Sequence, residues 1–142
     1  MRARLAAVVG TVVLGAGMLV NAPTAHAADP VTEFDVTVGN TYTRGTITWH
    51  NRSVTVAGEQ KSVSSSSCRG TTAFTLDASN KQLGLNYTSR TCGASEKFTA
   101  FTVPADVPGG AAVVRICLDD GALPATYLSC KRYGRPSSRP GS

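Results

Sequence analysis

The segment from residue 45 to residue 58 constrains the fold of this chain more than any other stretch. Its first two apolar residues, Ile47 and Trp49, are odd-numbered, whereas the next two are even-numbered, so one unbroken strand would place them on opposite faces. A tight turn at Asn51-Arg52 resolves the conflict, because it brings both pairs to one face of an antiparallel hairpin. The hairpin then has four core anchors, which are Ile47, Trp49, Val54 and Val56.

The N-terminal stretch is typical of a secretory signal peptide. Two arginines follow Met1, an apolar run extends from Leu5 to Val20, and Ala25-His-Ala27 supplies a small-x-small cleavage site. The apolar run is too short for a comfortable membrane span, and no later run is apolar enough for one. We therefore expect removal of residues 1–27 and a secreted, extracellular product without a membrane span.

Cysteine usage predicts how the mature chain is braced. Removing 27 of the 142 residues leaves 115, enough for one domain, and all four cysteines lie in this part. An even number of cysteines in an oxidising compartment indicates two disulfides. Of the three possible pairings we favour Cys68 with Cys92 and Cys117 with Cys130, which join near neighbours in a meander. A zinc site is the alternative, but the chain has no C-x-x-C pair.

Short alternating segments fill the mature chain, and no long segment shows the 3.6-residue period of an amphipathic helix. A change of parity between Phe98 and Phe101 indicates a bulge or contacts on both faces. The pattern predicts an all-β fold, a single antiparallel β-sandwich, with an immunoglobulin-like Greek key as the favoured topology and a small barrel as the second choice. The expected strands are 32–38, 42–49, 53–57, 72–76, 83–87, 98–103, 112–118 and 126–133.

The C-terminal end carries the positive charge that the mature chain has in excess. Loss of Arg2 and Arg4 reduces 14 basic side chains to 12, against 9 acidic ones, which leaves a net charge of about +3. Residues 134–142 contain no aliphatic side chain that could join a core. We therefore expect a disulfide-braced domain over residues 28–133 and a disordered basic tail over 134–142.

Groups suited to catalysis are scarce. His50 is the only histidine of the mature chain, and no G-x-S-x-G segment is present. The adjacent acids Asp119 and Asp120 are turn formers, although D-D-G could also ligate calcium. We predict no catalytic, cofactor-binding or metal site, and thus not an enzyme. Exposed tyrosines could stack on sugar rings, as in β-sandwich carbohydrate-binding modules, and the candidates are Tyr42, Tyr127 and Tyr133.

Several segments together resemble a family of small secreted β-rich proteins of actinobacteria. They are residues 45–56 around Trp49, the lone Cys68 and Cys92, residues 103–110, and Ile116-Cys-Leu118 closing with Cys130. The likeness covers most of residues 40–133 and implies no activity or site. The shortage of catalytic groups and the disulfide-braced scaffold instead lead us to expect a monomeric, non-catalytic extracellular binding or structural module. Its expected partner is a cell-wall polymer or another secreted protein and not nucleic acid. The alternative is a protease inhibitor or toxin-like effector that presents loop 58–68.

Overall fold

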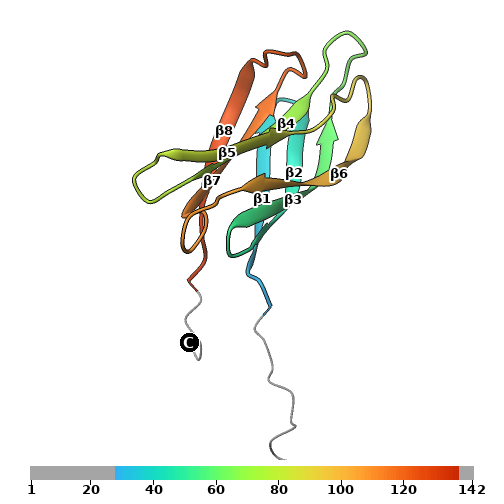
Figure 1. Ribbon diagram of the computed structural model, residues 1–142. Helices are drawn as coiled ribbons and strands as arrows, with labels where there is room; N and C mark the ends of the chain where they lie inside the picture. Colours follow the sequence, from blue (N-terminus) through green and yellow to red (C-terminus); the bar gives the residue numbers. More distant parts are fainter. Residues whose placement is uncertain (1–27, 138–142) are drawn as a thin grey trace, which may run out of the picture.

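The computed structural model describes residues 28–137, so the predicted signal peptide and residues 138–142 lie outside the described part. Eight strands form two four-stranded antiparallel sheets, with the orders β1-β2-β3-β6 and β5-β4-β7-β8, packed as the two layers of a sandwich (Figure 1). The strands are β1 (Val31–Val38), β2 (Thr41–Trp49), β3 (Ser53–Lys61), β4 (Gly70–Leu76), β5 (Gln82–Tyr87), β6 (Ser95–Pro104), β7 (Val113–Asp119) and β8 (Tyr127–Gly134). The predicted β-sandwich is confirmed and the barrel is wrong, while the narrower immunoglobulin-like topology stays a prediction.

The β2–β3 hairpin has the register that its alternation predicts. Trp49 pairs with Val54 and Ile47 with Val56, and all four side chains are fully buried in the core between the sheets. The indole Nε1 of Trp49 donates a hydrogen bond of 2.9 Å to Thr32 Oγ1 on β1. Because its one polar atom has a partner, the largest side chain of the core is buried without an unsatisfied donor.

The parity change in β6 is a bulge. Val56 pairs with Phe101 and Gly58 with Phe98, so β6 uses one residue more than β3 between these two pairs. Both phenylalanines then pack against the same core, with their ring centroids 5.8 Å apart. The extra residue is what allows side chains of opposite parity to share one face.

Strand β4 is buried on both faces. Ala73 faces the core between the sheets, whereas Phe74 and Leu76 pack with Cys117 in a second, smaller apolar cluster. Side chains alternate along a strand, so this second cluster lies on the outer face of the sheet. The sandwich therefore has an apolar layer on one outer surface as well as in its middle.

The two disulfides have the predicted pairing, Cys68 with Cys92 and Cys117 with Cys130. The second bond joins register partners on the neighbouring strands β7 and β8. The first bond joins the loop after β3 to the segment between β5 and β6, so it ties two long connections together. No free cysteine is found between residues 28 and 137.

The predicted domain boundary at Tyr133 is too early. Strand β8 includes Gly134, and the next residue, Arg135, donates hydrogen bonds from Nε to Ala111 O at 2.9 Å and from Nη2 to His50 O at 2.7 Å. The expected disorder is thus wrong at 134 and 135, because this arginine binds main-chain carbonyls and needs no apolar side chain to be held. The rest of that prediction concerns mainly residues 138–142, which are not described.

Candidate functional site

A groove of about 840 Å³ opens on the outer face of the second sheet. Strand β5 forms one wall and the loop between β7 and β8 forms the other. The main side chains that line it are Thr72, Leu85, Tyr87, Arg90, Asp119 and Tyr127, together with loop residues 121–125. The apolar outer cluster described above lies beside it, because Thr72 and Phe74 are alternate residues of β4 and share that face.

Two tyrosines on different strands stand in the groove. Tyr87 on β5 is 49% exposed and Tyr127 on β8 is 44% exposed. The ring of Tyr127 rests edge-on against buried Phe74, with centroids 5.6 Å apart and planes at 83°. Such support fixes the orientation of an exposed ring, which lowers the entropy lost when a ligand packs on it.

The floor of the groove contains a buried carboxylate. Asp119 accepts hydrogen bonds of 2.7 Å from Thr72 Oγ1 and from the N–H of Gly121. Burial raises the pKa of Asp119, although these two hydrogen bonds oppose the effect. The neighbouring Asp120 is partly exposed, and hydrogen bonds from the main-chain N–H groups of Thr126 and Ala122 lower its pKa. Both carboxylates therefore accept main-chain N–H groups of the loop that follows β7 and stabilise its conformation.

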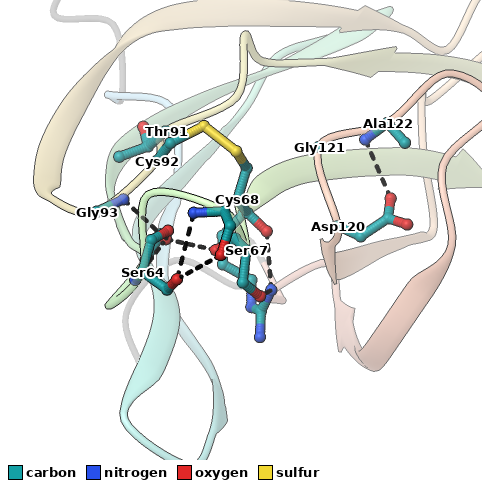
Figure 2. The surroundings of a disulfide bond; sticks show 12 residues. Ser64, Ser67, Cys68, Thr91, Cys92, Gly93, Asp120, Gly121 and Ala122 are labelled. Carbon is teal, nitrogen blue, oxygen red and sulfur yellow. Dashed lines mark hydrogen bonds between the residues drawn. A yellow bond between two sulfur atoms is a disulfide. The ribbon is translucent and has the colours of Figure 1, made fainter.

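The loop wall is fixed against the first disulfide. Figure 2 shows residues 120–122 beside Cys68, with the Asp120–Ala122 hydrogen bond drawn. Gly121 has a φ of +72°, and a Cβ there would lie 2.6 Å from Arg90 Cβ and 3.4 Å from Cys68 Cβ. The absence of a side chain thus permits both the turn and the close contact.

The other half of the disulfide's surroundings is a serine-rich turn. Ser62 Oγ lies 2.6 Å from Ser67 O and accepts the N–H of Gly93 at 3.0 Å, so one hydroxyl links both cysteine-bearing segments. Figure 2 shows Ser64, Ser67 and Gly93 around this point. The disulfide and these hydrogen bonds therefore fix the segment around Cys68, against which the loop wall of the groove packs at Gly121.

His50 lies elsewhere, in the turn between β2 and β3, and forms a carboxylate–imidazole–hydroxyl series. Its Nδ1 is 2.6 Å from Asp29 Oδ2 and its Nε2 is 2.8 Å from Thr55 Oγ1, the connectivity of hydrolase triads. Thr55 pairs with Thr48 on one side and Thr102 on the other. The neighbouring peptide N–H groups are therefore committed to the ladders and are poorly placed to stabilise an oxyanion. The series fastens residue 29 to the hairpin.

No group of three or more His, Cys, Asp or Glu side chains that could hold a metal ion is found within residues 28–137. Asp119 and Asp120 point their carboxylates at different main-chain donors of the loop. The hydrogen bonds of both carboxylates thus stabilise the turn that follows β7.

Of the three tyrosines predicted as sugar-stacking candidates, only Tyr127 lies in the groove. Tyr42 is covered by the guanidinium of Arg44, which is 3.6 Å from the ring centroid. The hydroxyl of Tyr133 on β8 accepts a hydrogen bond of 3.0 Å from the N–H of Asp35 on β1, so this side chain links the two strands. The sequence analysis did not identify Tyr87 as a site residue. The signal is its alternation with Leu85 on one strand, opposite Phe74 on the other, which puts all three side chains on one face.

Comparison with protein-family models, curated proteins and solved structures finds no match to this chain. The resemblance to small secreted actinobacterial proteins therefore stays a prediction. The two disulfides indicate folding in an oxidising environment. In the described part of the chain, no helix has the length and apolar character needed to cross a membrane.

Proposed function

We propose that this protein is a secreted, non-catalytic binding module whose ligand occupies the groove on the second sheet. The observation that carries the proposal is the pair Tyr87 and Tyr127, both exposed in a groove whose floor and loop are fixed. Aromatic rings on a rigid scaffold bind flat apolar surfaces, including sugar rings, at little cost in conformational entropy. A cell-wall polymer is therefore the preferred ligand, and another secreted protein is the second choice.

The extracellular location in this proposal rests on two supports. The first 27 residues have the charge and hydropathy pattern of a signal peptide. The two disulfides need an oxidising compartment, and the first of them braces the connections beside the groove. A braced scaffold with binding residues on its outer face suits a protein that works outside the cell.

The protease-inhibitor alternative has less support. Residues 58–61 of its expected loop belong to β3 and pair with both β2 and β6. The remainder is a tight turn, in which the N–H of Ser67 donates to Ser64 O at 3.1 Å. Protein clefts that bind peptides commonly take an extended segment by strand addition, which a closed turn does not offer.

The direct test measures retention of the mature protein on purified cell wall. We expect Tyr87→Ala and Tyr127→Ala each to weaken binding roughly tenfold, since an aromatic contact is worth about 1 kcal/mol or more. Tyr87→Phe keeps the ring and should retain most of the affinity. Tyr42→Ala removes a tyrosine from the opposite sheet and should leave binding unchanged.

Melting curves of each variant would separate lost binding from lost folding. Full retention by both alanine variants would place the binding surface elsewhere on the molecule. Absence of any partner in both cell wall and culture supernatant would argue against a binding module altogether.

A further inference from the structure

Two arginines stand directly opposite each other on the outer face of the second sheet. Arg115 of β7 pairs in register with Arg132 of β8. Like charges placed directly across an antiparallel pair are destabilising. Within residues 28–137, the ion pairs are Arg44 with Asp35, His50 with Asp29 and Arg52 with Asp106, so neither of the two arginines is neutralised by a carboxylate.

Arg115 is held in a fixed position. Its guanidinium carbon lies 4.2 Å from the ring centroid of Phe74, a phenylalanine that is only 5% exposed. The Nε atom of Arg115 is shielded from solvent and has no hydrogen-bond partner among the described residues. A guanidinium that is stacked on a ring and keeps unused donors is preorganised for an anionic acceptor. Arg132 is exposed, and its Nη2 contacts Asn80 Oδ1.

The arginine pair adjoins the groove. Arg115 and Asp119 are on one strand, four residues apart and on the same face, which corresponds to about 14 Å at the usual rise of a strand. The Cys117–Cys130 disulfide lies between them, with Cys117 buried and Cys130 exposed. Arg90 lines the groove itself. A ligand chain lying in the groove could therefore reach the guanidinium groups without leaving this face of the sheet.

We propose that Arg115 and Arg132 form an anion subsite beside the groove, and that the ligand is an acidic glycan carrying carboxylate or phosphate groups. This inference rests on the proposed function, which places the sugar rings of the glycan on Tyr87 and Tyr127 in the groove. A like-charge pair that costs stability in the free protein becomes favourable once an anion bridges it. The subsite therefore selects acidic over neutral polymers.

The experiment measures the affinity of the mature protein for three soluble glycans. Polygalacturonate carries carboxylates, poly(glycerol phosphate) carries phosphates, and the methyl ester of polygalacturonate has the same sugar without the charge. We expect at least tenfold tighter binding of one or both acidic polymers than of the ester, and a loss of this preference at high salt. The acidic polymer that binds more tightly identifies the source of the anion.

Variants assign the effect to the two arginines. Arg132→Gln should lower the affinity for the acidic polymer at least tenfold, because a charge-assisted hydrogen bond is lost. Arg115→Met keeps most of the cover over Phe74 and should have a similar effect. Arg44→Gln makes the same change in net charge on the opposite sheet and should alter the affinity less than twofold. Arg132 is exposed, so its variant tests the subsite even if Arg115→Met folds poorly.

Each contrary result has a distinct meaning. Equal binding of polygalacturonate and its ester, lost in Tyr87→Ala but not in Arg132→Gln, would overturn the anion subsite and leave the groove intact as a glycan site. Equal losses in Arg132→Gln and Arg44→Gln would reduce the effect to general charge attraction and overturn the subsite. Binding of anionic lipid vesicles or nucleic acid in place of all glycans would overturn both proposals.

Discussion

At the scale of single residues, Asp119 shows how a buried carboxylate shapes a loop. Burial raises its pKa, the charge of Asp120 acts in the same direction, and the hydrogen bonds from Thr72 and Gly121 act against both. A carboxyl group with a higher pKa in the folded than in the unfolded state holds its proton more tightly when folded. The contribution of Asp119 to stability is therefore most favourable below about pH 4, its pKa in the unfolded chain. It declines as the pH rises from there through the higher pKa of the folded state.

Asp119→Asn should remove this dependence, because the amide keeps the size and an acceptor oxygen but does not ionise. We expect wild type to lose stability relative to Asp119→Asn between pH 3.5 and pH 7, measured as the shift in urea midpoints of the two proteins. Asp120 is present in both, so its opposite titration largely cancels in the comparison. A difference that does not change with pH, or that favours wild type more at pH 7, would contradict the assignment.

At the scale of elements, β2 and β3 approach each other closely at a pair of glycines. Gly45 and Gly58 are register partners, flanked across the sheet by Phe34 on β1 and Phe98 on β6. A Cβ on Gly45 would lie 1.9 Å from Ala57 O, and one on Gly58 would lie 2.1 Å from the main-chain oxygen of the residue before Gly45. Backbone atoms of the partner strand would have to move for either side chain to fit.

Substitution at either glycine should therefore be severe. We expect Gly45→Ala and Gly58→Ala each to lower the free energy of unfolding by about 3 kcal/mol or more, which corresponds to a fall in Tm of roughly 10 °C or more. Gly134→Ala on β8 is the matched control, since nothing lies within 4 Å of a Cβ there. It should be neutral or slightly stabilising. Similar Tm values for all three variants would mean that the strands can separate at little cost.

At the scale of the whole molecule, Arg135 joins the two sheets. It follows the last strand of the second sheet, and its guanidinium donates to His50 O at the end of the β2–β3 hairpin of the first. Its guanidinium carbon also lies 5.3 Å from the ring centre of Trp49. One side chain thus closes the open end of the sandwich over the largest residue of the core.

Loss of this contact should be visible in both stability and spectroscopy. We expect Arg135→Ala to lower Tm by several degrees and to shift the emission of the single tryptophan to longer wavelength, because water gains access to Trp49. Arg135→Lys keeps the charge but not the planar fork, so it should restore little. Lys131→Ala removes the same charge from an exposed position on β8 and should change neither quantity. An unchanged Tm in Arg135→Ala would show that the contact contributes nothing to folding.

Several features could be predicted because they depend on residues that are near one another in the sequence. Side-chain alternation and a short turn determine the register of Trp49 with Val54, and the pairing of near-neighbour cysteines, favoured among three possibilities, is the one found. The register that pairs Cys117 with Cys130 also pairs Arg115 with Arg132, two positions earlier on β7 and two positions later on β8. The local sequence pattern was therefore sufficient to predict the hairpins and which side chains share a face of each sheet.

The sequence by itself thus determined the strands, their hairpins and the covalent bracing. Only the tertiary structure decided which face of β4 meets the core, and hence that Phe74, Tyr87 and Tyr127 lie outward beside a groove. It also decided that Arg135 reaches His50, a residue 85 positions away in the chain. Period-two alternation shows which side chains share a face, but the position of that face depends on how strands distant in sequence are stacked.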